Sequence, residues 1–310
     1  MTGADGTALL FPGQGAQRAG MGEVWRDCAS WELIGTLSEH TGADVEELLL
    51  KADDETLRRT DLAQIAVFST AVLALYEARA AGLHGTAYAG HSLGEYVALH
   101  AAGALTLPAA AALVGERGRA MRQAAAEEPG SMAVLVGADA AAVDLLVASA
   151  HADGHRMWVA NVNCPGQIVV AGTHEGIAHV DGAAGDHGAK VIRVPVGGAF
   201  HTPLMAGAGE RLSRALRSVR FAPRHEPLVA NADARVHTGA DVDWRDLAVR
   251  QLTGPVLWER SVEVLHDELG CRRFVTLGPS GVLAGMVRRI RPEAAVTTLD
   301  TAERAAARVS

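Results

Sequence analysis

Cysteine, aromatic residues and excess positive charge are all scarce in this chain of 310 residues. Its three cysteines, Cys28, Cys164 and Cys271, are odd in number and far apart, so they fit neither a disulfide framework nor the spacing of a metal site. We therefore expect no bound metal and a reducing, cytoplasmic location. With 28 Lys and Arg against 36 Asp and Glu, the net charge of −8 gives no reason to expect nucleic acid as a partner.

A secretion leader and a membrane span are not expected either. The N-terminus carries Asp5 and no basic, apolar segment, so no signal peptide is visible. Residues 96–115 contain no Asp, Glu, Lys or Arg, and a stretch of twenty such residues has the length of a membrane span. This stretch is mostly alanine, however, and includes His100, Gly103 and Pro108. We predict two buried helices with a break at 106–108, and no membrane association.

The glycine-rich run at residues 13–15 lacks the features of a nucleotide site. Arg18 stands where a dinucleotide-binding motif needs its third glycine, and no Lys-Ser or Lys-Thr pair follows as in a phosphate loop. We therefore expect no bound cofactor.

The most informative segment that is present is the run Gly90-His91-Ser92-Leu93-Gly94. An apolar strand precedes it and a helical pattern follows, which is the arrangement of a nucleophile elbow. The two glycines let strand and helix pack closely around an exposed serine, and the Leu93 amide at the helix start can point at a developing oxyanion. The alternative is that Gly-x-Ser-x-Gly occurs by chance in a chain with 34 glycines.

The order of predicted elements indicates two subdomains. Residues 128–197 read strand, helix, strand, strand, helix, strand, which is the split βαβ pattern of a small sandwich. We predict an α/β protein in which a large α/β-hydrolase-like subdomain with a parallel sheet, residues 1–127 and 198–310, carries an inserted small ferredoxin-like (βαββαβ) subdomain. In the insertion we expect strands at 132–137, 158–163, 167–172 and 190–196 and helices at 139–150 and 173–188.

His201 is the candidate base for Ser92 among 13 histidines. It follows Gly197-Gly198, where the small subdomain rejoins the large one, which is a natural position for one wall of a cleft. His91 is a competitor, but adjacent residues on a turn point apart. We therefore assign His91 to substrate binding.

Five short segments together carry a family resemblance. They are Phe11-Pro-Gly-Gln-Gly-Ala-Gln17, Gly90-His-Ser-Leu-Gly-Glu95, Glu116-Arg117-Gly118, Asn161-Val-Asn-Cys-Pro-Gly-Gln167 and Ala199-Phe200-His201. In this order and spacing, the chain resembles malonyl-CoA:acyl carrier protein transacylases, and the acyltransferase domains of polyketide synthases, over nearly its whole length. Each segment alone is a weak signal, whereas five in order are specific.

The resemblance implies a role for each matched residue. Ser92 corresponds to the acylated nucleophile, and His201 to the general base and later the acid. The amides of Gln14 and Leu93 correspond to the oxyanion hole. Arg117 corresponds to the clamp for the free carboxylate of malonate, since a planar guanidinium grips a carboxylate through two parallel hydrogen bonds.

Three further residues follow from the same resemblance. In the family a main-chain carbonyl orients the histidine; the matching stretch is 249–255, and we assign this role to Gly254, where the best-known members carry asparagine. Gln64 and Gln167 lie in stretches similar to those that line the family's cleft, and we expect them to contact substrate. The alternative for Gln167 is that it satisfies buried backbone groups in a strand.

Arg117 and Phe200 bear on which acyl group is accepted. An acetyl group would leave the Arg117 guanidinium without its carboxylate partner, at a cost of about 1–3 kcal/mol. The alternative is a solvated helical arginine paired with Glu116 or a neighbouring residue. In polyketide synthase relatives a bulky apolar residue after the serine, here Leu93, together with Phe before the histidine goes with malonyl rather than methylmalonyl. Phe200 would fill the space of a methyl branch, or else simply pack in the core.

An acyl carrier protein is the partner that the resemblance implies, with malonyl-CoA and the phosphopantetheinylated carrier as the two substrates. Carrier proteins are usually acidic, so docking on this acidic chain needs a local basic cluster. We assign this basic cluster to Arg288, Arg289, Lys190 and Arg193; the alternative is a solvated charged face. We expect a monomer.

The sequence leaves the following alternatives open. A serine hydrolase that releases acyl groups from thioesters would use the same elbow, and an inactive docking scaffold would need none of the chemistry. The pathway, fatty acid or polyketide, and the acceptance of substituted malonyl groups are not fixed by these residues.

Overall fold

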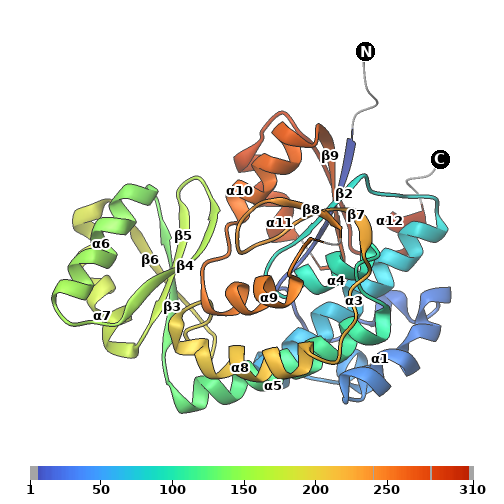
Figure 1. Cartoon of the computed structure of the whole chain (residues 1–310), viewed down its shortest axis with the longest axis horizontal. Helices are drawn as coiled ribbons and strands as arrows, with labels where there is room; N and C mark the ends of the chain where they lie inside the picture. The colour runs from blue at the N-terminus through green and yellow to red at the C-terminus, as the bar shows by residue number, and fades with distance from the viewer. Residues whose placement is uncertain (1–5, 240, 280, 307–310) are drawn as a thin grey trace.

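The computed structural model describes residues 6–239, 241–279 and 281–306, and shows a large subdomain with a smaller one projecting from its side (Figure 1). The large subdomain contains a six-stranded sheet in the order β10-β9-β1-β2-β7-β8. All neighbouring strands are parallel except β7 and β8, which are antiparallel. Its strands are β1 (Gly6–Phe11), β2 (Ala87–Gly90), β7 (Arg224–Val229), β8 (Val236–Gly239), β9 (Cys271–Leu277) and β10 (Ala295–Leu299).

Helices cover both faces of this sheet, as expected for parallel strands. The described helices of the large subdomain are α1 (Ile34–Thr41), α2 (Val45–Leu50), α3 (Thr60–Ala80), α4 (Gly94–Ala101), α5 (Leu107–Glu127), α8 (Ala206–Leu216), α9 (Trp244–Thr253), α10 (Trp258–Glu263), α11 (Gly281–Ile290) and α12 (Ala302–Ala306). Along β1, Leu9 and Phe11 join the cluster formed with α3, α4 and α5, while Ala8 and Leu10 join the cluster formed with α10 and α11. The period of two along the strand therefore separates two cores.

The small subdomain is a four-stranded antiparallel sheet in the order β4-β5-β3-β6. Its elements are β3 (Ser131–Val136), α6 (Ala140–Ala152), β4 (Met157–Cys164), β5 (Gln167–Gly172), α7 (His174–Ala183) and β6 (Lys190–Val194). This is the ferredoxin-like order, so the predicted fold class is confirmed. All six elements lie inside 128–197; the helix expected at 173–188 ends earlier, at Ala183, and continues as a 3-10 turn to His187.

The uncharged stretch 96–115 breaks where the sequence predicted. α4 ends at Ala101, and α5 begins at Leu107 after Thr106, whose side chain accepts a hydrogen bond from the Ala109 amide at 3.3 Å. Pro108 occupies the first turn of α5, where its missing N–H costs nothing. By length and composition α3 could also cross a membrane, but 83% of its most apolar window is buried, as in a core helix.

Main-chain hydrogen bonds tie the two subdomains together beside the elbow. Val256, just after α9, donates from its amide to Ala160 and accepts from Val162, both at 2.9 Å, which adds a short parallel pairing to β4. The neighbouring Asn163 side chain is bonded to the imidazole of His91 at 2.9 Å. The insertion is thus held against the segment that carries Ser92.

Candidate active site

The turn between β2 and α4 holds Ser92 in a left-handed backbone conformation, with φ of 52°. The flanking glycines are needed because of close backbone approach. A Cβ on Gly90 would lie 1.9 Å from the carbonyl carbon of Gly94, and a Cβ on Gly94 would lie 2.2 Å from the carbonyl oxygen of Phe11. These contacts are those of a nucleophile elbow rather than of a chance motif.

Ser92 faces His201 across the junction of the two subdomains. The Ser92 Oγ lies 2.8 Å from His201 Nε2, and only 9% and 4% of these residues is exposed. His201 Nδ1 lies 2.7 Å from the main-chain carbonyl oxygen of Gln251. A carbonyl can only accept, so Nδ1 carries the proton and Nε2 is left free to accept one from the serine.

Burial lowers the pKa of His201 to about 3, and the positive charge of Arg117 acts in the same direction. The imidazole is therefore neutral near pH 7, which is the state that a general base requires.

The prediction that Gly254 orients the histidine is wrong: the carbonyl is that of Gln251. The physical reason is the position of the helix end. Gln251 lies in the last turn of α9, where carbonyls have no intrahelical donor, and Gly254 follows the helix. The sequence stretch was the right one, but only the helix end decides which oxygen is free.

Arg117 points from α5 into this centre and is 1% exposed. Its Nη2 donates to Ser92 Oγ and to Gln251 Oε1, both at 3.1 Å, and its Nη1 donates to Gln64 Oε1 at 2.5 Å. The alternative of a solvated arginine paired with Glu116 or a neighbour is wrong, since Arg117 is buried and Glu116 pairs with Arg119 at 3.4 Å. The structure thus brings Arg117 to the nucleophile, and Gln64 to Arg117.

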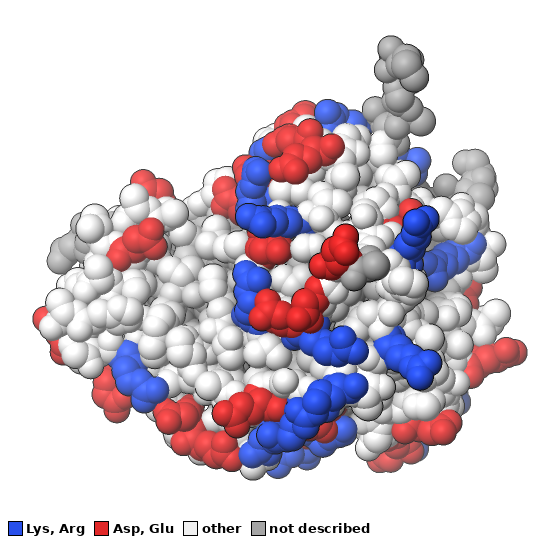
Figure 2. Space-filling view, viewed as in Figure 1, with Lys and Arg blue, Asp and Glu red and all other residues white. Residues whose placement is uncertain are grey.

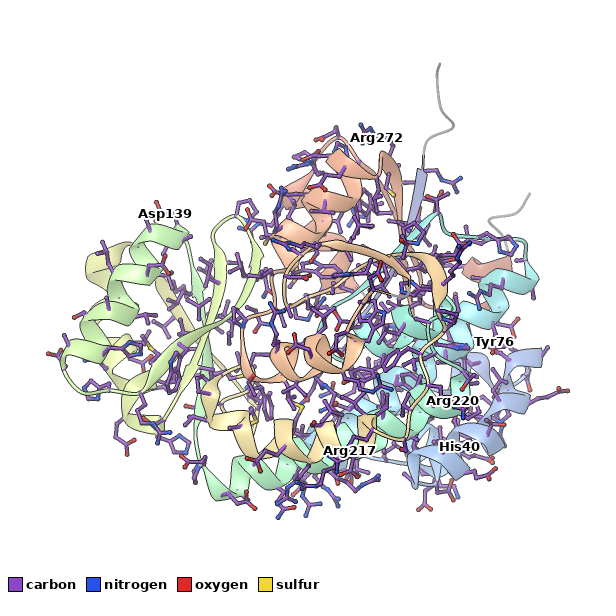
Figure 3. All side chains as sticks on the ribbon, viewed as in Figure 1. His40, Tyr76, Asp139, Arg217, Arg220 and Arg272 are labelled. Carbon is purple, nitrogen blue, oxygen red and sulfur yellow. The ribbon has the colours of Figure 1, made fainter. Side chains whose placement is uncertain are left out.

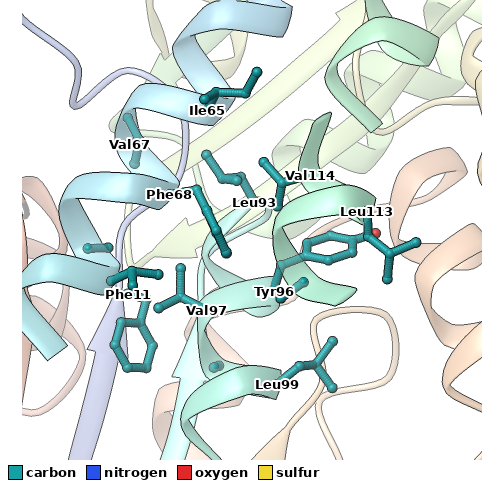
Figure 4. Close-up of a cluster of buried hydrophobic side chains, with 14 of the residues drawn as sticks. Phe11, Ile65, Val67, Phe68, Leu93, Tyr96, Val97, Leu99, Leu113 and Val114 are labelled. Atoms are coloured by element: carbon teal, nitrogen blue, oxygen red, sulfur yellow. The ribbon is translucent and has the colours of Figure 1, made fainter. Parts of the chain in front are cut away.

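Two amides are available where an oxyanion hole is expected. Within the described part of the chain, the amides of Leu93 and Gln14 have no hydrogen-bond acceptor. The Ser92 amide is already bonded to the Asn231 side chain at 2.7 Å. The Leu93 side chain is fully buried in the core near Phe68 and Val114 (Figure 4), so only its main chain faces the site.

A groove of about 120 Å³ leads away from the elbow between the 12–16 loop and α11. It is lined by Pro12, Gly13, Gln14, Gly15, Ala16, His91, Pro279, Val282, Leu283 and Met286. Its walls are mostly apolar, and Val282 is 66% exposed at its rim. A narrow apolar groove of this kind suits an extended, weakly polar chain better than a sugar or a nucleotide.

Other predicted site residues lie outside the Ser92–His201–Arg117 centre. Gln167 begins β5 and accepts a weak bond from the Cys164 thiol at 3.8 Å, which favours its structural alternative. Phe200 is 5% exposed and packs in the main core beside His201. Within the described part of the chain neither residue is hydrogen-bonded to Ser92, so their roles toward substrate stay predictions.

Three of the four residues of the basic cluster already have hydrogen-bond or ion-pair partners within the protein. Arg193 pairs with Asp181. Arg288 donates to the Val296 carbonyl oxygen at 3.3 Å. Arg289 donates to the Pro165 carbonyl oxygen at 2.6 Å, which places it beside the β4–β5 turn of the small subdomain, and Lys190 is exposed at the start of β6.

Three buried residues at the centre escaped the sequence reasoning: Glu95, Asn231 and Gln251. They are between 0% and 2% exposed. Glu95 was visible as an acidic residue three positions after the serine, at the start of the helix that follows it, and Asn231 as a polar residue just after an apolar strand. Only the folded chain shows that Glu95 is hydrogen-bonded to both Asn231 and Gln251. Among the described residues, no group of three or more His, Cys, Asp or Glu side chains could hold a metal ion.

An α/β fold with a serine elbow and a facing histidine is the arrangement of enzymes that move acyl groups through a serine ester. The chain belongs to the acyl transferase domain family, whose model matches residues 8–290. This confirms the resemblance found in the sequence.

Its relatives narrow the class. The chain is similar to malonyl CoA-acyl carrier protein transacylases of Bacillus subtilis, 36% identical over 286 residues and covering 91% of this chain and 90% of that protein, and of Escherichia coli K12, 36% identical over 290 residues and covering 91% and 92%.

The fold is also similar to solved structures of proteins with these names. An acyl-carrier-protein S-malonyltransferase from Burkholderia pseudomallei superposes with a TM-score of 0.92 at 32% identity, covering 98% of this chain and 99% of that one. A type II PKS acyl-carrier protein in complex with its malonyl-transacylase matches with a TM-score of 0.90 at 31% identity, covering 97% and 98%.

Proposed function

We propose that this protein transfers a malonyl group from malonyl-CoA to the phosphopantetheine thiol of an acyl carrier protein through an ester on Ser92. The relatives that bear this activity in their names support the overall reaction. The single observation that carries the proposal is that one hydroxyl, Ser92 Oγ, lies 2.8 Å from His201 Nε2 and 3.1 Å from Arg117 Nη2.

In the first half-reaction Ser92 Oγ attacks the thioester carbonyl of malonyl-CoA, and its proton passes to His201 Nε2. The carbon–sulfur bond breaks, and the leaving CoA sulfur takes that proton. In the second half-reaction the carrier thiol gives its proton to His201 and attacks the ester. The Ser92 oxygen leaves and recovers the proton, so the enzyme returns unchanged.

The oxyanion formed in each half-reaction needs donors that are already in place. We assign the free amides of Leu93 and Gln14 to this role. A donor of this kind contributes about 3–4 kcal/mol to lowering the barrier. Since the Ser92 amide is bonded to Asn231, it cannot supply one.

Arg117 is proposed to select the dicarboxylic substrate. In the free protein its guanidinium already donates to the amide oxygens of Gln64 and Gln251, so an acetyl group would not leave it unpaired as the sequence argument assumed. Preference for malonyl then rests on exchanging neutral acceptors for a carboxylate, whose charge-assisted hydrogen bonds are roughly twice as strong.

The carrier protein is proposed to dock where Arg289 and Lys190 border the same end of the small sheet. Gly166 lies between Arg289 and the strand end that carries Lys190. A Cβ there would lie 3.4 Å from Arg289 Nη2, and its carbonyl oxygen accepts from the Gly137 amide at 3.0 Å, one residue past the Val136 that pairs with Lys190. On the face shown in Figure 2 charges of both signs alternate over the large subdomain, so docking needs a local cluster rather than a general field.

We further propose that the protein acts as a cytoplasmic monomer. Its three cysteines are free, which suits a reducing compartment. Light scattering measures the molar mass in solution, and we expect the mass of one chain. A stable dimer would contradict this part of the proposal.

Intact-protein mass spectrometry tests the reaction. Mixing the protein with malonyl-CoA should add one malonyl group, and the Ser92→Ala variant should add none. Adding a phosphopantetheinylated carrier protein should move the label to the carrier. Free malonate released at the same rate with and without carrier would identify a hydrolase instead, and absence of loading would overturn the proposal.

A further inference from the structure

Glu95 is a buried carboxyl group that the reaction above does not use. It lies in the first turn of α4, three positions after the nucleophile, and is 2% exposed. A buried carboxyl group without a role is unusual because its burial opposes folding unless hydrogen bonds compensate. The partners of its two oxygens therefore indicate what it does.

Each oxygen of Glu95 accepts a hydrogen bond from a different segment of the chain. Oε2 accepts from the main-chain amide of Asn231 at 2.6 Å, just after β7. Oε1 accepts from the side-chain amide of Gln251 at 3.1 Å, in the last turn of α9. One side chain thus joins α4 to two segments that are 136 and 156 positions further along the chain.

Both segments hold the nucleophile. Asn231 accepts from the Ser92 amide at 2.7 Å and donates to the Gly90 carbonyl oxygen at 2.8 Å. Gln251 donates from its side-chain amide to the Ser92 carbonyl oxygen at 2.8 Å. The strained turn is therefore held on its amide side by one partner of Glu95 and on its carbonyl side by the other.

Gln251 also contacts the other two reacting side chains. Its main-chain carbonyl oxygen accepts from His201 at 2.7 Å, and its side-chain oxygen accepts from Arg117 at 3.1 Å. Glu95 accepts from the NH₂ group of Gln251 and so sets the orientation of this side-chain amide. In that orientation the amide oxygen faces Arg117.

We propose that Glu95 is a positioning residue, which aligns Ser92, His201 and Arg117 by fixing the side chain of Gln251 and the main chain at Asn231. It touches none of the reacting atoms. This inference deepens the proposed malonyl transfer and rests on it. The charged groups that surround Glu95 are Arg117 from α5 and Asp233 from the turn before β8, with the Tyr96 hydroxyl nearby.

The isosteric variant Glu95→Gln isolates this role. Each carboxyl oxygen of Glu95 keeps a lone pair for its N–H donor whether or not the group carries its proton, whereas the NH₂ group of glutamine has none. In the variant one contact would therefore turn from attraction to a donor–donor clash, while the side-chain volume stays the same. We expect the rate of Ser92 malonylation to fall at least about tenfold, with the KM for malonyl-CoA changed by less than about threefold, because the loss concerns alignment in the transition state.

A double-mutant cycle with Gln251→Ala gives the sharper test. Gln251→Ala keeps the main-chain carbonyl that orients His201 but removes the side-chain amide that Glu95 holds. If Glu95 acts through that amide, adding Glu95→Gln to Gln251→Ala should cost less than about threefold more. Losses that multiply in full, or a normal rate in Glu95→Gln, would overturn the inference.

The matched control is Glu77→Gln on α3. Glu77 likewise accepts a main-chain amide bond, from Ser30 at 2.7 Å, but it has no contact with Ser92, His201 or Arg117. Its malonylation rate should stay normal. If Glu95→Gln does not fold by circular dichroism, Glu95→Asp takes its place in the cycle, since it keeps both oxygens but withdraws them by one methylene.

The outcome for the wild type separates the two hypotheses. A wild-type protein that does not load malonate would overturn the proposed function. A wild-type protein that loads malonate, beside an equally fast Glu95→Gln variant, would overturn only the role of Glu95.

Discussion

Ser92 and His201 are 109 positions apart, yet both hold a left-handed backbone, with φ of 52° and 60°, where their side chains meet at 2.8 Å. Such conformations cost a non-glycine residue about 1–3 kcal/mol and persist only when the surroundings enforce them. Here two hydrogen bonds enforce the conformation: the Ser92 amide donates to the Asn231 side chain, and the Gln251 side chain donates to the Ser92 carbonyl oxygen.

This backbone strain predicts different stabilities for two inactive variants. Ser92→Gly and Ser92→Ala both remove the hydroxyl, but only glycine adopts positive φ without cost. We expect Ser92→Gly to be more stable than Ser92→Ala by about 1 kcal/mol, measured by urea denaturation. Equal or reversed stabilities would show that the turn is not strained.

The low pKa of His201 predicts a flat acid limb in the pH profile. A base with a pKa of about 3 stays neutral at pH 5. A histidine with its ordinary pKa would lose roughly 30-fold in neutral fraction between pH 7.5 and pH 5. We expect the rate constant for Ser92 malonylation, from quenched-flow mass spectrometry, to change less than about threefold over that range. A steep fall centred near pH 6.5 would contradict the assignment.

Arg117→Ala should lower malonyl loading far more than acetyl loading. Removal of a charge-assisted pair costs about 1.5–3 kcal/mol, which corresponds to roughly 10–150-fold in rate. Arg119→Ala is the matched control, because Arg119 lies on the same helix but is half exposed and bonded to the Thr41 carbonyl oxygen at 3.0 Å. The measurement is loading from malonyl-CoA and acetyl-CoA; an equal loss with both would remove Arg117 as the selector.

Charge reversal at Arg289 or Lys190 should weaken the carrier protein alone. We expect Arg289→Glu and Lys190→Glu to raise the KM for the carrier several-fold at low salt and to leave the KM for malonyl-CoA unchanged. Arg217→Glu serves as control, since Arg217 is exposed just after α8, at the lower edge of Figure 3. Parallel rises in both KM values would point to the groove rather than to docking.

Glu95 predicts a pH-dependent difference in stability between wild type and Glu95→Gln. Burial raises the pKa of Glu95 to about 8 in the folded protein, from 4.5. The folded state therefore binds the proton more tightly, and the contribution of Glu95 is full below pH 4.5 and is lost as pH rises through 8. The wild type should lose stability relative to the variant by up to about 1.4 kcal/mol per pH unit in that window.

Urea denaturation of both proteins at several pH values measures this difference, and the other titrating groups cancel in the comparison. A constant difference between pH 5 and pH 9 would show that Glu95 keeps an ordinary pKa.

The sequence by itself determined the fold class, the elbow at Ser92 and the candidate base His201, because these depend on local patterns. The periodic burial of strands and helices is visible in the order of neighbouring residues. Along β1, for example, Leu9 and Phe11 face one core while Ala8 and Leu10 face the other. Glycine at 90 and 94 marks a close approach whatever the rest of the chain does.

Only the tertiary structure decided which groups complete the site. The oxygen that orients His201 comes from Gln251 and not from Gly254, because the end of α9 leaves that carbonyl free. Glu95, Asn231 and Gln251 meet although more than 130 positions separate Glu95 from the other two. Hydrogen bonds over such distances depend on how helices and strands pack, and no local pattern of residues records that packing.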